Sequence, residues 1–597
     1  NWTSSPVYYS PDLSIYLTAQ PASLNTPSYG DLFSEGFRSW LITNEYIDSN
    51  AANTSYEGND TSTNASNNWT NIQTITSADN SVFSNIASSK NPSNNHAAYV
   101  TLNTGNSKLS YGFRQTDNTW SHNSYTANSG RSNVDMNSDG DAIIIFEPWY
   151  STTLTAIYKD HGQDEWSSPE TIAVAEMHAM RSNFKINNNG DVAVVWLESD
   201  NNGKRYIKFN ERINGSWVGE TIISDSDFDK ELPSIAYNDN RDVAISWQNW
   251  NMNNEGRYDV VGAFRNGTSQ LWGALETYSD TNNHAGFSQV AINSSGDAIF
   301  YWRQATGNFV ANEAENTVGV LKTRYRNYDG SLEQIVNVSP NGEDSFNASK
   351  ELTEPRIVFE GDHAAVTWWG INGNHNVIYA ATMVDKTTWN STALTTNGKS
   401  ADLPSITMDS NGFIAVAWQR TDGTYQRVQS KFYNPTTSSW SSVMTLSSSD
   451  ANAIHSDITV DGNSNATASW VLWNNSLGKY MPQIKQYSPV VITLLGDNPV
   501  TLEVGSSYNE PSATAVNENN EDVSDNIVIS GIVDNSIVGT YTLTYDATDS
   551  ENNVALSVIR TVNVVDTTAP IITLLGDLTV TIQEGSTYTD AGATAED

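Results

Sequence analysis

A phrase of about twelve residues recurs along most of this chain, and it limits the possible folds more than any other feature. Its clearest copy, Lys185 to Trp196, reads Lys-Ile-Asn-Asn-Asn-Gly-Asp-Val-Ala-Val-Val-Trp, which predicts a strand, a polar turn and an apolar second strand. The aromatic residues that end the copies lie 50, 51, 55, 66, 50 and 52 positions apart, at Phe146, Trp196, Trp247, Trp302, Trp368, Trp418 and Trp470. A period of this size indicates a repeat architecture.

Each repeat divides into four short β segments. In the copy at 178–226, we expect strands at 183–186, 192–198, 205–211 and 219–223. Four antiparallel strands in about fifty residues, repeated, make the blades of a β-propeller. A second aromatic residue opens the fourth strand in most copies, at Trp120, Trp166, Trp217, Trp272, Trp389 and Trp440. We expect both sets of aromatic residues to pack between neighbouring blades and not to form a ligand site.

The ends of the repeat region predict how the ring closes. Seven copies are clear, and 81–128 is a weaker eighth, while the last copy lacks its fourth strand. The segment 69–77 resembles the fourth strand of another copy, so we expect it to complete the last blade. Closure of this kind removes exposed sheet edges. The predicted fold is all-β: an eight-bladed β-propeller, with seven blades as the alternative, followed by immunoglobulin-like β-sandwich modules.

The predicted domains follow from changes in sequence texture. Residues 1–67 are a polar, irregular N-terminal segment, and 68–488 form the propeller, with 69–77 closing its last blade. Residues 489–566 form one module of alternating strands, typical of a β-sandwich. The pattern of Val491 to Asp497 returns at Ile571 to Asp577, so 567–597 begin a second module. We expect the array to continue beyond Asp597.

Two parts of the chain resemble known families. The stretches ITLLGDNPVTLEVGSSYNEPSATA, VGTYTLTYDATDSENNVA and RTVNVVDTTAP resemble the bacterial immunoglobulin-like repeats found in strings on secreted and surface proteins. The repeats FKINNNGDVAVVW and ITMDSNGFIAVAWQ resemble secreted bacterial propeller repeats of the form V-A-V-D-x-x-G-N-A-x-A-V-W. They are distantly similar to the Asp-box propellers of the sialidase type, but no turn keeps the full Asp-box. The resemblance implies a propeller and carries no enzymatic activity.

Composition excludes several classes of partner. The chain has 30 Lys plus Arg against 68 Asp plus Glu, a formal charge of −38, which repels nucleic acid and anionic membranes. It has no cysteine, and no apolar run approaches the eighteen or so residues that a membrane span needs. Few charged residues and many Asn, Ser and Thr favour a secreted or cell-surface protein.

Candidate site residues lie where first strands begin, because first strands line the central channel of a propeller. A sialidase-like hydrolase would use arginines there, and a polysaccharide lyase would use a histidine, tyrosine or lysine as base together with a group that neutralises charge. The alternative is that these are ordinary surface charges. The ligand-binding candidates are His178, Arg181, His284 and Arg356, with Arg131 and His455 at comparable places.

One turn resembles a calcium loop. Asp135-Met-Asn-Ser-Asp-Gly-Asp141 places Asp135, Asn137, Asp139 and Asp141 at alternate positions, as hard oxygen ligands of calcium are placed. Calcium is the one cofactor that the sequence suggests. The alternative is a plain hairpin turn, since Asn, Asp and Gly suit such turns without an ion.

These observations predict a non-enzymatic extracellular head on an immunoglobulin-like stalk. Its function would be adhesion to or recognition of a cell-surface glycan or protein, or a structural part in a fibre or layer formed by self-assembly. The alternative is a secreted polysaccharide-degrading enzyme, a glycoside hydrolase or a lyase, with a propeller catalytic domain. The argument is architectural, and one fold hosts many functions.

Overall fold

The computed structural model describes residues 73–74 and 81–597, apart from internal stretches of which 306–318 and 347–356 are the longest. The described residues form strands throughout, with one 3-10 turn at Ser524–Asn526, so the all-β prediction is confirmed. The predicted N-terminal segment 1–67 and the candidate Arg356 lie outside the described residues.

Eight antiparallel sheets lie between Gln73 and Tyr487 in the described part of the chain, and we number them 1 to 8 in chain order. Sheet 1 contains β2 (Ser81–Ser88), β3 (Ala97–Asn103), β4 (Lys108–Arg114) and β5 (Asn123–Thr126), and sheet 2 contains β6 (Ser129–Met136), β7 (Ala142–Pro148), β8 (Thr153–Lys159) and β9 (Glu170–Val174). Sheet 3 contains β10 (His178–Ile186), β11 (Val192–Ser199), β12 (Arg205–Ile213), β13 (Ser216–Trp217) and β14 (Thr221–Ile222). Sheet 4 contains β15 (Lys230–Tyr237), β16 (Val243–Asn251), β17 (Arg257–Arg265) and β18 (Glu276–Thr277).

Sheet 5 contains β19 (Ala285–Ile292), β20 (Ala298–Ala305), β21 (Gly319–Arg326) and β22 (Val336–Asn337), and sheet 6 contains β23 (Asp344–Phe346), β24 (Ile357–Glu360), β25 (His363–Asn372), β26 (His375–Asp385) and β27 (Thr388–Ala393). Sheet 7 contains β28 (Ala401–Met408), β29 (Ile414–Thr421), β30 (Gln426–Asn434), β31 (Ser439–Trp440) and β32 (Met444–Thr445). Sheet 8 contains β33 (Ala453–Val460), β34 (Ala466–Asn474), β35 (Lys479–Tyr487) and β1 (Gln73–Thr74).

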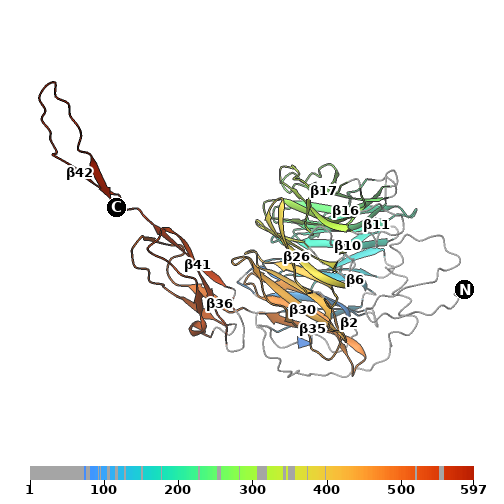
Figure 1. Ribbon diagram of the computed structural model, residues 1–597. Coiled ribbons are helices and arrows are strands. Elements are labelled where there is room, and N and C mark those ends of the chain that lie inside the picture. Colours follow the sequence, from blue (N-terminus) through green and yellow to red (C-terminus); the bar gives the residue numbers. More distant parts are fainter. Residues whose placement is uncertain are drawn as a thin grey trace.

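The sheets form a closed ring. Each sheet contacts the next in chain order, and β2 of sheet 1 contacts β33, β34 and β35 of sheet 8, as Figure 1 shows for β2 and β35. Strand β1 pairs with β35, with Gln73 opposite Ile484 and Thr74 opposite Gln483. We propose that each sheet is one blade, so that the fourth strand of the last blade comes from the N-terminal side of the chain.

The core lies between the sheets, in one hydrophobic cluster at each contact. Trp196, for example, packs among residues of sheets 2 and 3, and Trp302 among residues of sheets 4 and 5. The indoles of all six recurring tryptophans are at most 1% exposed. The tryptophans of the outer strands, such as Trp217 and Trp272, cover the same clusters from outside. The prediction that both sets of aromatic residues pack between repeats is confirmed.

The recurring polar turns join neighbouring sheets at one end of the central channel, which we call the turn face. The Asn187 side chain donates to Asn238 O at 3.2 Å, Asn238 Nδ2 donates to Asn293 O at 3.0 Å, and Asn293 Nδ2 donates to Gly361 O at 2.9 Å. These bonds explain why the phrase recurs: its first Asn satisfies a buried carbonyl in the next repeat.

Lys90 spans the channel at the turn face. It follows the first strand of sheet 1, yet its ammonium group donates to Met408 O at the end of β28 in sheet 7. The same group lies 3.8 Å from Glu360 Oε1 at the end of β24 in sheet 6. Because first strands line the channel, this side chain crosses its turn-face end. A ligand that enters the channel is therefore expected at the opposite end, the entry face, where first strands begin.

A β-bulge near the entry face accompanies the recurring tryptophan in five sheets. The register between first and second strands shifts so that two residues face one tryptophan, as Phe287 and Ser288 face Trp302. The first bulge residue has a positive φ although it is not glycine, at Arg181, Leu232, Phe287, Leu403 and His455. In sheet 2 the aromatic residue is Phe146, and it pairs directly with Ser132. Bulges of this kind redirect side chains at the rims of barrels and near sites.

The immunoglobulin-like module follows the propeller, and a hairpin within 571–596 lies beyond it (Figure 1). The module contains β36 (Val491–Leu494), β37 (Val500–Glu503), β38 (Ala513–Val516), β39 (Val528–Ser530), β40 (Gly539–Asp546) and β41 (Val558–Val565), and the hairpin contains β42 (Ile571–Leu574) and β43 (Ala593–Glu596). The guanidinium of Arg560 is fully buried at the centre of the module. It donates to Glu510 Oε1 at 2.9 Å, to Tyr545 Oη at 3.1 Å and to Leu495 O at 2.6 Å, which satisfies the buried charge.

Candidate functional site

The strand order places three chain segments of every sheet at the entry face: the start of the first strand, the end of the second and the start of the third. In sheet 3 this is visible in the register, where His178 pairs with Ser199 and Ser199 pairs with Arg205. Side chains from neighbouring sheets meet there. We describe the group formed by Arg205, Glu231, Gln248, Trp250, Tyr258 and His284, and call it the entry-face cluster.

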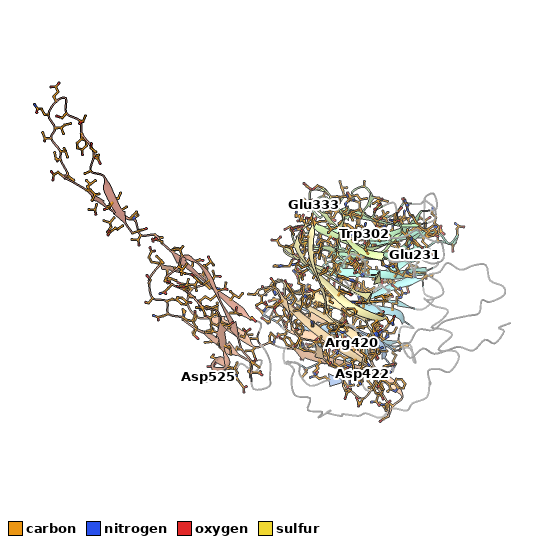
Figure 2. All side chains as sticks on the ribbon, in the orientation of Figure 1. Glu231, Trp302, Glu333, Arg420, Asp422 and Asp525 are labelled. Atoms are coloured by element: carbon orange, nitrogen blue, oxygen red, sulfur yellow. The ribbon has the colours of Figure 1, made fainter. Side chains whose placement is uncertain are left out.

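A charged pair and an amide form one half of the entry-face cluster. Arg205 Nη1 of sheet 3 donates to Glu231 Oε1 of sheet 4 at 2.6 Å, and Gln248 Nε2 donates to Glu231 Oε2 at 3.1 Å. The Gln248 carbonyl accepts the backbone N–H of Phe287 in sheet 5 at 3.1 Å. The Glu231 side chain, labelled in Figure 2, is 10% exposed and that of Arg205 is 20% exposed. The pair is therefore held by three sheets while one edge meets solvent.

Aromatic rings form the other half of the entry-face cluster. Trp250 and Tyr258 face each other across β16 and β17, with ring centroids 4.7 Å apart and an interplanar angle of 66°. The His284 ring packs edge-on against Tyr258 at 5.3 Å, and its Nδ1 accepts the Tyr258 backbone N–H at 3.1 Å. Trp250 and Tyr258 are half-buried, whereas His284 is buried.

The environment holds both titratable rings in their neutral forms at neutral pH. Burial lowers the pKa of His284 to about 4, and the nearby Arg303 adds to the decrease. Burial also raises the pKa of Tyr258, reinforced by Glu231 and opposed by Arg205 and Arg181. The hydroxyl and the imidazole can therefore donate and accept hydrogen bonds, but neither has the pKa near 7 that suits a general base.

The structure brings together two of the residues singled out from sequence. His284 lies in the entry-face cluster, and the charge of Arg181, at the bulge of β10, acts on Tyr258. His178 begins β10 at the same face, although its side chain lies outside the described residues. Arg131 pairs with Glu147 just after the register shift near the start of β6. His455 occupies the bulge of β33, where its backbone N–H donates to Gln419 Oε1 at 3.2 Å. The assignment of a ligand to these residues stays a prediction.

The residues of the predicted calcium loop divide between two sets of contacts. Asp135 Oδ2 accepts the backbone N–H of Ile186 in sheet 3 at 3.1 Å and lies 3.5 Å from Lys185 Nζ. Asn137 and Asp141 bond each other within the turn, with Asn137 Nδ2 donating to Asp141 Oδ2 at 3.0 Å. Asp139 is exposed at the tip. Asp135 thus contacts the neighbouring sheet, and the calcium assignment stays a prediction.

Sequence reasoning missed Arg205, Glu231, Gln248, Trp250 and Tyr258. A signal existed for one of them: Trp250 stands three residues after a recurring aromatic residue, outside the repeated phrase. Trp473 occupies the same place in sheet 8 and packs against Tyr480 at 5.1 Å. Arg205, Glu231 and Tyr258 carry no such mark, because their meeting depends on how three sheets stack.

Comparison with known proteins identifies one domain. Residues 492–564 match the family described as bacterial surface protein, Ig-like domain, and this range falls inside the predicted module 489–566. The match covers a minor part of the chain. No curated protein matches the chain.

Solved structures with similar folds include enzymes that act on polysaccharides. A PL25 ulvan lyase is 11% identical, covering 60% of this chain and 94% of its own, with a TM-score of 0.38. The polysaccharide lyase Uly1 is 7% identical over 66% of this chain and 88% of its own, at 0.39. The GH93 arabinofuranosidase of Fusarium graminearum is 11% identical over 60% and 91%, at 0.33. Scores this low carry no argument about function. Among the described residues, no helix is long and apolar enough to cross a membrane.

Proposed function

We propose that this protein is an extracellular recognition protein whose propeller binds carbohydrate at the entry-face cluster. The immunoglobulin-like module connects that head to a bacterial surface. The observation that carries the proposal is the position of the Trp250–Tyr258 pair beside the Arg205–Glu231 pair on one open face.

The chemistry of the entry-face cluster suits a sugar. A sugar ring has an apolar face that packs on an aromatic ring, and hydroxyl groups around its edge that need donors and acceptors. Binding sites combine aromatic surface with a few fixed polar groups in this way. Glu231 supplies acceptors and Arg205 supplies donors, and three sheets hold both in place, which lowers the entropy cost of binding. The family match at 492–564 supports the surface location.

Recognition fits the entry-face cluster better than catalysis does. A lyase needs a group that removes a proton, and the pKa of the Tyr258 hydroxyl lies above its ordinary value. The pKa of His284 is about 4, so its imidazole is a weak base at neutral pH. Its Nδ1 is already an acceptor for a backbone N–H.

A glycan array probed with the labelled full chain tests the proposal. We expect binding to a restricted set of glycans, and at least about tenfold weaker binding for Trp250→Ala, because each 1.4 kcal/mol of lost contact is tenfold. Trp473→Ala removes the equivalent tryptophan of sheet 8 and is the matched control, expected to bind as the parent does. Equal binding by Trp250→Ala would contradict the proposed site.

The same glycans are then incubated with the protein and analysed by mass spectrometry. Intact glycans are expected after prolonged incubation. If shortened or unsaturated products are released and their release depends on Tyr258, the function is polysaccharide degradation and the proposal of recognition is wrong. Tyr258→Phe distinguishes the two, because it removes the reactive hydroxyl and keeps the ring.

A further inference from the structure

The turn face of sheet 2 carries a cluster of three groups that can bind a metal ion. Asp141 ends the recurring turn between β6 and β7, and Asp160 and His161 begin the loop after β8. His161 Nδ1 lies 2.7 Å from Asp141 Oδ1 and 3.9 Å from Asp160 Oδ1. One donor atom from each residue lies within 4.8 Å of the other two.

Part of this arrangement belongs to the repeat. In four sheets the aspartate that ends the turn accepts a backbone N–H from the loop after the third strand of its own sheet. The four bonds are His161 N to Asp141 at 3.0 Å, Asn214 N to Asp191 at 3.1 Å, Gly267 N to Asp242 at 2.8 Å and Tyr328 N to Asp297 at 2.8 Å. This bond explains why the aspartate recurs, and it needs no ion.

Sheet 2 departs from the repeat in the residues that surround this bond. In sheet 2 the donor residue is a histidine that follows an aspartate. In the other three sheets the donor residues are Asn214, Gly267 and Tyr328. In sheet 3 the second oxygen of the aspartate instead binds Arg241 Nε at 2.8 Å, and in sheet 5 it accepts the Tyr325 hydroxyl at 2.7 Å. The imidazole and the second carboxylate are additions that ring construction does not require.

A second histidine lies against the same turn. His96 of sheet 1 packs on Gly140, so closely that a Cβ on that glycine would lie 2.2 Å from His96 Nδ1. Its Nδ1 is buried and has no hydrogen-bond partner among the described residues. The charge of His161 acts on His96, which places the two imidazoles in one neighbourhood. His96 therefore packs against the turn that carries Asp141, and a backbone hydrogen bond joins it to Asp139.

We propose that Asp141, Asp160 and His161 bind a divalent transition-metal ion of the zinc class. Ligand bonds of 2.0 to 2.2 Å in a tetrahedral site place donors roughly 3.3 Å apart, and the separations of 2.7 and 3.9 Å bracket that value. A nitrogen ligand favours zinc, copper or nickel over calcium or magnesium, which take oxygen ligands. When the ion binds, His161 Nδ1 loses its proton to solvent and coordinates the metal through its lone pair.

The site keeps one open coordination position. The side chains of His161 and Asp160 are 45% and 54% exposed, so a solvent molecule completes the ion's shell. Three protein ligands with one exchangeable position is the coordination of accessible zinc sites. The proposal does not depend on carbohydrate binding, because the cluster lies at the opposite face.

Titration of the chelator-treated full chain with Co²⁺ tests the proposal. We expect the visible absorption of a tetrahedral cobalt site to appear on adding Co²⁺ and to disappear on adding one equivalent of Zn²⁺. His161→Ala and Asp160→Asn should each weaken Zn²⁺ binding by at least about 100-fold in calorimetry, the upper end of the loss seen when only a supporting group is removed. Asp385→Asn, in an equivalent exposed hairpin of sheet 6, is the matched control.

Unchanged Zn²⁺ binding by both His161→Ala and Asp160→Asn would overturn the proposal. Displacement of Co²⁺ by millimolar Ca²⁺ would also overturn it, in favour of an oxygen-ligated calcium loop. The thermal midpoint of each variant is measured first. Asp160 is exposed, so Asp160→Asn gives a readout even where His161→Ala unfolds.

Discussion

Asp457 joins three sheets at the place where the ring closes. Its Oδ2 accepts the backbone N–H of Ile86 in sheet 1 at 3.0 Å, and its Oδ1 accepts the Ser405 hydroxyl of sheet 7 at 2.6 Å. The contact crosses 371 residues of chain. Thr459 adds a second link, because its Oγ1 accepts the Ser88 N–H at 3.1 Å. The hydrophobic cluster between sheets 8 and 1 is small, consisting of Ile86, Tyr99 and Ile484 with Trp120 beside it. Polar bonds therefore contribute unusually much to this closure.

Asp457→Ala should destabilise the closed ring. The substitution leaves the buried Ile86 N–H without its acceptor, and an unsatisfied buried donor costs about 1–3 kcal/mol. Urea unfolding followed by tryptophan fluorescence measures the free energy. Asp457→Asn retains an acceptor oxygen and should lose less. A midpoint equal to that of the parent for Asp457→Ala would show that the bond contributes nothing to closure.

Removal of the strand segment around Gln73 should open the last sheet. Deleting residues 1–77 removes β1, so β35 becomes an exposed edge that invites association with other chains. We expect a lower thermal midpoint and larger species in size-exclusion chromatography. Deleting only residues 1–67 keeps β1 and is the matched control. Identical behaviour of the two truncations would mean that β1 does not close the ring.

The architecture could be predicted from the sequence because each part of the repeated phrase is determined by residues close together in the chain. A turn, an apolar strand and a terminal tryptophan each have local causes, and the tryptophans are buried as expected. The bulges could not be predicted in the same way. Their positive φ values fall on Arg181, Leu232, Phe287, Leu403 and His455, residues that give no sign of a left-handed conformation. In sheet 5 the bulge N–H is bound by Gln248 from the preceding sheet, a contact that sequence alone does not reveal.

The entry-face cluster depends still more on packing. Arg205, Glu231 and Phe287 come from three sheets, and Gln248 links the last two. Of the residues chosen from sequence, His284 lies in this cluster and the charge of Arg181 acts on Tyr258. Glu231 comes from the first strand of sheet 4, whereas Arg205, Gln248 and Tyr258 come from second and third strands. Their meeting depends on how the sheets stack.

Trp302→Ala should be among the most destabilising substitutions in the propeller. The indole is fully buried between sheets 4 and 5, and its Nε1 donates to Gln304 Oε1 at 2.9 Å. Deleting a buried tryptophan side chain costs about 3–5 kcal/mol. Trp272, a partly buried tryptophan of an outer strand, gives the comparison, and Trp272→Ala should cost clearly less in urea unfolding. Equal losses would contradict the inner tryptophans' larger part in the core.

His284 should make stability depend on pH between about 6.5 and 4. The folded state lowers the pKa of His284 to about 4, so the unfolded chain binds more protons in this range. Stability is therefore full above the ordinary histidine pKa and falls as pH decreases toward 4, by on the order of 3 kcal/mol. His284→Asn retains an acceptor for the Tyr258 N–H and should flatten the profile of thermal midpoint against pH. His375→Asn tests whether loss of any histidine does the same.

Glu503 should fix the linker that follows the immunoglobulin-like module. Its Oε1 accepts the backbone N–H groups of Thr567 at 2.7 Å and Thr568 at 2.9 Å, and both hydroxyls also donate to its carboxylate, at 2.7 and 2.8 Å. These bonds lower the pKa of Glu503 to about 2. A depressed carboxyl pKa means that the bonds are fully present above the ordinary value and are lost only as pH falls through about 2.

Glu503→Ala should therefore make the linker at 566–570 a site of rapid proteolysis at neutral pH, whereas the parent chain should resist cleavage there even at pH 4. Limited proteolysis with mass spectrometry of the fragments measures both, and Glu521→Ala, a carboxylate elsewhere in the module, is the control. Cleavage of the parent linker at the rate of the variant would show that these bonds do not hold the linker in place.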